Sequence, residues 1–271
     1  MNKSPFFSYQ GLVDAKNSLS CVTMNAKAFL KGYSVRFSYD RAICSYVASE
    51  KLKKCYFINR KRGHRLYKNG IVNRGEFIFN SYRLNNISFK PGDVVIDCGA
   101  NSGDLHLELQ VREPGISYIG IEPNPDDFKS LARNVSLSNK TLLNLALGEQ
   151  DGVLPFYVYT EKGDSSIVEP PVYTHKISVD VVRLDKVFVD INIDRVKLLK
   201  LEAEGYEIEI LRGASGLLDR IEYIAVDGGY ERGKDKEQTF TWMTNFLILN
   251  GFEIIDIYFP WCRALFRRRE T

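Results

Sequence analysis

The chain has 271 residues, of which 44% are hydrophobic and 26% charged, and this composition excludes wholesale disorder. A net charge of +3 is too small to indicate nucleic-acid binding by itself, the first ten residues lack the apolar core of a signal peptide, and no apolar stretch is long enough to span a bilayer. The five cysteines are odd in number and include no Cys-x-x-Cys pair, which favours reduced thiols in a cytoplasmic protein.

Residues 1–75 are predicted to form an N-terminal extension of helices and a hairpin. Residues 18–30 and 38–52 have helical patterns, and residues 56–74 are predicted to form two basic strands around the turn Lys68-Asn69-Gly70. The basic residues from Lys51 to Lys68 are expected to form a solvated surface, with an anionic partner as the alternative.

Residues 76–271 are predicted to form an α/β domain in which short β-branched runs alternate with helical patterns. The predicted strands are 93–97, 117–121, 141–146, 196–201, 222–226 and 252–259. The predicted helices are 105–111, 125–138, 206–218 and 238–250. Near-continuous apolar strands separated by helices indicate a mostly parallel sheet with helices on both faces. Residues 152–159 and 175–184 interrupt this order, as an antiparallel insertion or with a loop over the site.

A short glycine-containing turn follows the first strand of this sheet. The strand ends at Asp97, and the turn Gly99-Ala100-Asn101-Ser102-Gly103 opens the next helix. Ligands of open parallel sheets bind at the carboxyl ends of the strands. Glycines let the backbone approach a ligand, and free N–H groups at a helix start favour an acceptor group. The sequence therefore predicts cofactor-binding roles for Asp97, Gly99, Ala100, Asn101 and Gly103.

The next strand ends in a second acid, in the segment Glu122-Pro123-Asn124. A carboxylate at this position can accept hydrogen bonds from both ribose hydroxyls of a nucleoside cofactor. The Gly-x-Gly-x-x-Gly pattern of nicotinamide dinucleotide sites is absent, and Asp97 would repel a pyrophosphate. The combination favours S-adenosylmethionine, with Ala146 beside its adenine; the alternative is that Asp97 and Glu122 only cap helices.

Five ordered segments resemble those of the FkbM-type methyltransferases: DCGANSG, GIEPNP, LALGEQDGVLPFY, ISVDVVRLD and VKLLKLEAEGYEIEILRGA. The resemblance implies a class I Rossmann-like methyltransferase fold with an antiparallel final strand. It also implies S-adenosylmethionine as the donor and O-methylation, commonly of a sugar or polyketide hydroxyl. We therefore expect a carbohydrate acceptor, in surface polysaccharide or related glycan biosynthesis. The family usually has Lys-x-Asp-x-Glu-Gly after the fourth strand, whereas this chain has Glu202 in place of the aspartate.

Methyl transfer to a hydroxyl requires an aligned acceptor and a group that removes its proton. Glu202 is the first candidate for the base and Glu204 the second, with Lys200 on the same side of the strand; the alternative is that Lys200 and a carboxylate only hold the strand end together. Glu202 and Asp227 are expected to hold Mg²⁺ or another divalent ion, if a metal takes part. His175, beside the insertion loop, is a further candidate base, with a surface role as the alternative.

The arginines at positions 267–269 are predicted to lie on a basic C-terminal tail that could bring the protein to the inner face of an anionic membrane; simple solvation is the alternative. No nucleic-acid partner is expected. Two other functions stay open. One is a catalytically silent methyltransferase-like scaffold that binds a partner through its basic N-terminus, and the other is a nicotinamide-dependent oxidoreductase.

Overall fold

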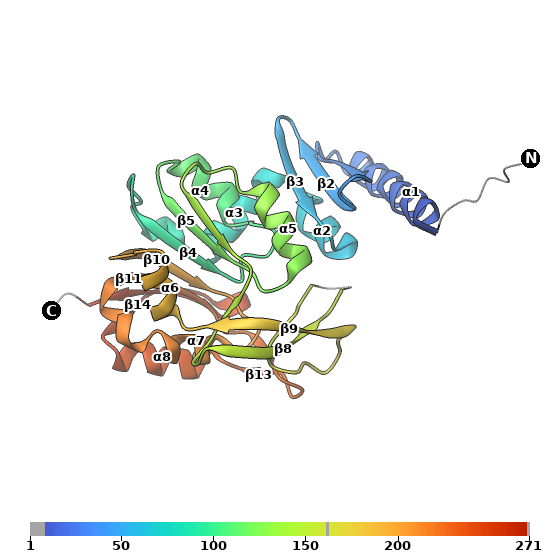
Figure 1. The fold of residues 1–271 in the computed structure, drawn as a ribbon. Helices are drawn as coiled ribbons and strands as arrows, with labels where there is room; N and C mark the ends of the chain where they lie inside the picture. The colour runs from blue at the N-terminus through green and yellow to red at the C-terminus, as the bar shows by residue number, and fades with distance from the viewer. Residues whose placement is uncertain (1–8, 161–162, 270–271) are drawn as a thin grey trace, which may run out of the picture.

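A seven-stranded sheet forms the centre of the computed structural model, which describes residues 9–160 and 163–269 (Figure 1). The strand order is β14-β15-β11-β10-β4-β5-β6. The strands are β4 Val94–Cys98, β5 Ser117–Ile121, β6 Lys140–Leu143, β10 Val196–Leu201, β11 Ile221–Asp227, β14 Phe252–Tyr258 and β15 Arg263–Arg268. Neighbours from β11 to β6 pair in parallel, and β15 is antiparallel to both β11 and β14. The α/β prediction and the antiparallel final strand are confirmed.

Helices cover both faces of this sheet because alternate side chains of its apolar strands point to opposite sides. Val95 and Ile96, neighbours on β4, are both fully buried, but they belong to two different apolar clusters. The cluster around Val95 includes residues of α3 Ile71–Ser81, α4 His106–Arg112 and α5 Pro125–Asn134. The cluster around Ile96 includes residues of α6 Leu184–Asp190, α7 Glu207–Gly213 and α8 Phe240–Leu249. Short 3₁₀ helices also connect elements: η1 Leu84–Asn86, η2 Ser215–Arg220 and η3 Phe259–Trp261.

A small second sheet interrupts the alternation where the sequence predicted an insertion. It contains β7 Ala146–Leu147, β9 His175–Val182 and β8 Gly152–Val158, in that order. β8 and β9 pair antiparallel, which confirms the antiparallel insertion. A separate short hairpin is formed by β12 Tyr230–Arg232 and β13 Glu237–Gln238.

The N-terminal part differs from the prediction. The helix predicted over residues 18–30 is confirmed within α1 Tyr9–Leu30. The helix predicted over residues 38–52 is wrong, because this segment forms parts of β1 Arg36–Asp40 and β2 Ser45–Glu50, which pair antiparallel and continue into β3 Lys53–Phe57. The basic hairpin predicted over residues 56–74 is also wrong. After the end of β3, that segment forms α2 Arg60–Tyr67 and the start of α3.

Local chemistry explains the second helix of this region. The side chain of Asn59 accepts a hydrogen bond from the backbone N–H of Arg62 at 2.9 Å and so caps the start of α2. Lys68-Asn69-Gly70 is then the turn between two helices instead of two strands. Asp104, beside the glycine turn, accepts a hydrogen bond from Tyr67 and pairs with Arg74 at 2.6 Å. The N-terminal helices are therefore anchored close to the predicted cofactor site.

Arg267 and Arg268 lie on β15 of the central sheet instead of a tail, and Arg269 directly follows this strand. Arg267 pairs with Glu253 of β14 at 2.7 Å, and the Arg268 guanidinium lies over the ring of Phe252. Over the described ranges 9–160 and 163–269, no helix is both long enough and apolar enough to cross a membrane.

Candidate active site

The turn after β4 takes a backbone shape that its glycines make possible. Gly99, Asn101 and Gly103 all have positive φ, at 71°, 48° and 85°. A Cβ at Gly99 would lie 1.8 Å from the carbonyl oxygen of Glu202, so only glycine lets the ends of β4 and β10 come this close. The strand order reverses between β5 and β10, on the two sides of β4, and this is where ligands bind in open α/β sheets.

Glu122 at the end of β5 holds this turn by its side chain. One carboxylate oxygen accepts a hydrogen bond from the N–H of Asn101, and the other accepts one from the N–H of Asn124, both at 2.8 Å. Burial and then the nearby carboxylate of Asp127 raise the pKa of Glu122 to about 8, against the opposing effect of the two N–H groups. Each oxygen can accept a further hydrogen bond, so the group is equipped to bind a pair of hydroxyls.

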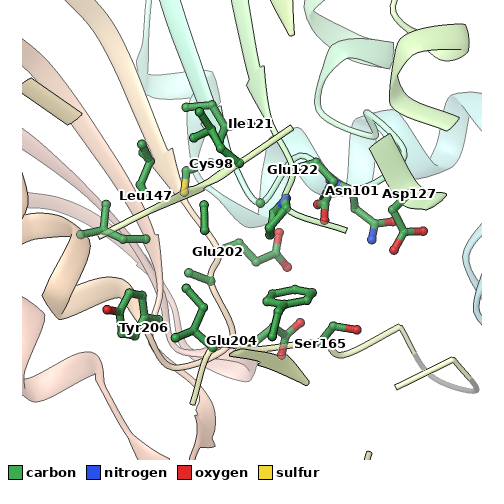
Figure 2. A pocket seen from close by; sticks show the side chains of 18 of the residues that line it. Cys98, Asn101, Ile121, Glu122, Asp127, Leu147, Ser165, Glu202, Glu204 and Tyr206 are labelled. Carbon is green, nitrogen blue, oxygen red and sulfur yellow. Dashed lines mark hydrogen bonds between the residues drawn. The ribbon is translucent and has the colours of Figure 1, made fainter. Parts of the chain in front are cut away.

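Glu122 lies in a narrow pocket, here called the inner pocket, between the carboxyl ends of the strands and the insertion (Figure 2). Its apolar walls are Ile121, Leu145, Ala146, Leu147, Phe156, Ile167, Tyr206 and Ile210. Gly99, Asn101 and Pro123 line it from the two turns, and Gly163 and Ser165 line it from the loop after β8. The charged lining consists of four carboxyl groups and one guanidinium: Glu122, Asp127, Glu202, Glu204 and Arg62. A flat apolar group and a cation therefore suit this pocket better than a pyrophosphate.

The other predicted cofactor residues are close to the inner pocket but do not line it. Ala100 and Gly103 are inside the turn, where the N–H of Gly103 donates to the carbonyl of Ala100 at 2.8 Å. The side chain of Asn124 caps α5. Asp97 is buried within the sheet, where it accepts a hydrogen bond from Tyr118 at 2.7 Å and pairs with Lys200 at 3.0 Å. Asp97 thus supports the turn through contacts inside the sheet.

Lys200 has the supporting role that was the alternative to catalysis. It is buried, pairs with Asp97 and with Glu202 at 2.9 Å, and donates to the carbonyls of Cys98 and Gly99. Burial acts to lower the pKa of Lys200, but the two carboxylates outweigh it and raise that pKa. A permanently charged lysine at this place holds the ends of β4 and β10 together.

Arg263 of β15 occupies the position between Glu202 and Asp227 where a divalent ion was expected. Its guanidinium donates to Asp227 at 2.7 Å, to Glu202 at 3.1 Å and to the hydroxyl of Ser81 at 2.6 Å. It also lies over the ring of Tyr82, 4.2 Å from the centroid. Within the described residues no group of three or more metal-ligating side chains forms a candidate site. The predicted pair Glu202 and Asp227 does not fit a metal ion, because both carboxylates are already bound to one guanidinium.

Glu202 and Glu204 lie on the same loop but differ in their electrostatic surroundings. Burial acts to raise the pKa of Glu202, but Lys200 and Arg263 outweigh it, so that pKa is lowered. The pKa of Glu204 is raised well above its ordinary value by burial and by the nearby carboxylate of Glu231. Figure 2 shows Glu122, Glu202 and Glu204 around the same open space. Glu204 is thus the carboxyl group of this loop whose protonated form the surroundings favour.

Glu207 holds the backbone of this loop in place through hydrogen bonds. It is fully buried, and one of its oxygens accepts hydrogen bonds from the N–H groups of Ala203 at 2.8 Å and Gly205 at 3.1 Å. Between these anchors, Glu204 takes the left-handed backbone conformation with φ 50°. This conformation is uncommon for a residue with a side chain and often occurs at functional sites.

A wider polar groove, here called the outer cleft, continues from the inner pocket. Arg62, Glu202 and Glu204 line both cavities. One wall comes from the N-terminal helices: Arg65, Leu66, Asn69, Asn73, Arg74 and Phe77. The other wall carries Asp227, Glu231 and the aromatic residues Tyr230, Phe259 and Trp261. Residues 60–77 therefore contribute directly to the site.

The histidines lie outside both cavities. His175 is exposed at the start of β9 and lines a separate surface groove with Asn124 and Tyr159. His106 is fully buried, where burial lowers its pKa to about 4, and its Nε2 accepts the N–H of Ser136 at 3.1 Å. His106 is a packing residue, and His175 is not positioned to act on a group in the inner pocket or the outer cleft.

Sequence reasoning did not identify three residues of the site: Arg62, Glu207 and Arg263. Arg263 had a usable signal, because a charged residue within an apolar strand is rarely buried without a partner. Glu207 falls in the first turn of a helix directly after the acidic loop, which indicates an N-terminal cap. Arg62 had no such signal, since its segment was predicted as a strand.

The fold and the site define a class I methyltransferase. Its parallel sheet has an antiparallel β15 inserted between β11 and β14, and the inner pocket lies at the reversal of strand order. The methyltransferase FkbM domain matches residues 97–254, which is more than half of the chain, and the chain belongs to this family.

Three curated relatives are similar to this chain. Methyltransferase 1 of Beauveria bassiana is 26% identical over 61% of this chain and 74% of its own length. The hexuronic acid methyltransferase AglP of Haloferax volcanii is 24% identical over 50% of this chain and 55% of its own length. The 31-O-demethyl-FK506 methyltransferase FkbM of Streptomyces tacrolimicus is 27% identical over 52% and 70%. Together with the family match, they identify the chain as a methyltransferase.

Proposed function

We propose that the protein is an S-adenosylmethionine-dependent O-methyltransferase that acts on a carbohydrate hydroxyl, in surface polysaccharide or related glycan biosynthesis. The observation that carries the proposal is the connection of two unlike cavities at Glu204. The inner pocket is apolar and acidic, the outer cleft is polar and aromatic, and both contain this carboxyl group.

The chemistry of the residues that line the inner pocket suits S-adenosylmethionine. Glu122 would accept the ribose hydroxyls, and Leu145 and Ala146 would border the adenine. The excess of carboxyl groups favours a cationic sulfonium and ammonium over the pyrophosphate of a nicotinamide dinucleotide. Bound there, S-adenosylmethionine supplies an activated methyl group.

Glu204 is the proposed general base. It lies where the two cavities meet, and its raised pKa makes it a stronger base toward an acceptor hydroxyl than an ordinary carboxylate. Glu202, the first candidate from sequence, is bound by Lys200 and Arg263 and has a lowered pKa, so we propose a positioning role for it.

The outer cleft suits a sugar. Aromatic rings such as Tyr230 and Trp261 can stack on the apolar faces of sugar rings, and Arg65, Asn69 and Asn73 offer hydrogen-bond donors to hydroxyls. The similarity to the hexuronic acid methyltransferase AglP supports this acceptor class.

Transfer of a labelled methyl group from S-adenosylmethionine to a panel of sugars and oligosaccharides tests the proposal. We expect label in at least one carbohydrate, dependent on Glu204 and lost in Glu204→Gln. A protein that binds S-adenosylhomocysteine but labels no acceptor would instead support the silent scaffold, and label only in non-carbohydrate acceptors would refute the sugar assignment.

A further inference from the structure

The helix α1 exposes a continuous apolar stripe. Leu12, Ala15, Leu19, Val22, Ala26 and Phe29 follow one another at alternating spacings of three and four, which places them on one side of the helix. All six are exposed, and the large side chains keep 57% (Leu12), 67% (Leu19), 61% (Val22) and 72% (Phe29) of their surface accessible. Leu30 adds a further 82% exposed side chain at the end of the helix.

This stripe takes no part in holding the fold together. The opposite side of α1 carries the buried residues Cys21, Met24 and Ala28, which pack with Val35 and Phe37 in the N-terminal core. Figure 1 shows α1 at the edge of the molecule, away from the central sheet. A chain that needed α1 only for packing would have polar residues on its outer side.

Lysines border one flank of the stripe. Lys16 and Lys27 are exposed, and at about 100° per residue they lie on the same flank, while the exposed Lys31 directly follows the helix. α2 lies near α1, because the ring of His64 contacts the ring of Phe37, whose backbone is hydrogen-bonded to Asn25 of α1. Further exposed basic side chains lie on α2 and just after it: Arg60, Lys61, Arg65 and Lys68.

This charge pattern distinguishes between two occupants of the stripe. In a symmetric antiparallel pair of α1 helices, the lysine flank of one copy would face the lysine flank of the other, and like charges repel. An anionic lipid surface instead attracts lysines on that flank, while the leucines and the phenylalanine enter the boundary between headgroups and acyl chains. Asp14, the acidic residue of α1, lies about 160° around the helix axis from Lys16.

We propose that α1 is an in-plane membrane-binding helix that attaches the protein to anionic lipid bilayers. The segment that follows the N-terminal sheet carries further exposed basic side chains, and its residues Arg62, Arg65 and Asn69 line the outer cleft. Docking through α1 would thus bring the outer cleft close to acceptors carried on the membrane surface, a consequence that rests on the proposed function, whereas the docking itself does not.

Sedimentation of the full chain with lipid vesicles tests this proposal. We expect binding to phosphatidylcholine vesicles that contain phosphatidylglycerol, weaker binding to phosphatidylcholine alone, and loss of binding at high salt. The double variant Leu19→Asp/Phe29→Asp should bind the anionic vesicles at least about tenfold more weakly. Lys16→Glu/Lys27→Glu should weaken binding to anionic vesicles only.

Leu249→Asp is the matched control, because Leu249 is an equally prominent leucine on α8, with 86% of its surface exposed. It should bind vesicles like the wild type. All variants should keep the wild-type circular dichroism spectrum and affinity for S-adenosylhomocysteine, which separates this test from the proposed function. Absence of wild-type vesicle binding, or equal binding by the α1 variant, would overturn the proposal. So would a dimer in light scattering that Leu19→Asp/Phe29→Asp converts to a monomer, since a second copy would then cover the stripe.

Discussion

The variants Glu204→Gln and Glu202→Gln distinguish a catalytic role from a structural role for the two glutamates of the loop after β10. Glutamine keeps the size of each side chain and removes its charge. Glu204 lies among like charges, which together with burial raise its pKa, so its neutral form is already favoured in the fold. Glu204→Gln should therefore leave the melting temperature unchanged or slightly higher, while loss of the base lowers kcat by about 10²–10⁴-fold.

Glu202→Gln should instead lower the melting temperature. It removes the negative partner of two buried cations, Lys200 at 2.9 Å and Arg263 at 3.1 Å. Because Glu202 keeps 22% of its side-chain surface exposed, we expect a loss of about 3 kcal/mol, toward the lower end for a broken buried ion pair. For a domain of this size the loss corresponds to a fall in melting temperature of about 6–12 °C.

Steady-state kinetics with a labelled methyl donor and thermal unfolding followed by circular dichroism measure both effects. Wild-type kcat in Glu204→Gln would refute the assignment of the base. An unchanged melting temperature in Glu202→Gln would refute the claim that Glu202 is bound tightly by Lys200 and Arg263.

Three further predictions concern the surroundings of this loop. Because the base must be ionised, and because burial and then the carboxyl group of Glu231 raise the pKa of Glu204, kcat should rise with pH only above the range in which an ordinary carboxyl group ionises. Glu231→Gln, which removes the neighbouring carboxyl group, should shift this rise to lower pH, and a profile unmoved by Glu231→Gln would contradict this electrostatic effect. Burial raises the pKa of Glu207 from 4.5 to about 7, so folding favours its protonated form, and its contribution to stability is complete below about pH 4.5 and lost as the pH rises through 7. Glu207→Gln mimics that form and should exceed the wild type in free energy of unfolding above pH 7, by up to about 3 kcal/mol in urea titrations, with no such gain near pH 4.5. Trp261→Ala should raise the KM for the carbohydrate acceptor by about tenfold and leave the affinity for S-adenosylhomocysteine unchanged. If the binding of acceptor and of S-adenosylhomocysteine weakened equally, the substitution would instead be disturbing the fold.

The methyltransferase domain could be predicted from the sequence because its strands are apolar runs with clear helical segments between them. Local pattern and burial agree in such a sheet, as at β4 and β10. The N-terminal part could not be predicted in the same way. Residues 38–52 contain a mixture of alanine, serine and charged residues that also suits a helix, and only pairing with β1 and β3 makes Ser45–Glu50 a strand.

The site was predictable in position but not in the roles of its charges. Strand ends placed Glu122 and Glu202 at one edge of the sheet, and the structure has them there. The partner that decides the role of Glu202 is Arg263, 61 residues later in the chain. Because β15 inserts between β11 and β14, this arginine reaches two acids that the sequence had assigned to a metal ion.

Calorimetric titration with S-adenosylhomocysteine, with NAD in parallel, tests the central claim most directly. We predict that the wild type binds S-adenosylhomocysteine and not NAD. Glu122→Ala should weaken that binding by about 10–100-fold, which corresponds to the loss of one charge-assisted hydrogen bond to the ribose. Binding of NAD by the wild type, or full affinity of Glu122→Ala for S-adenosylhomocysteine, would contradict the account.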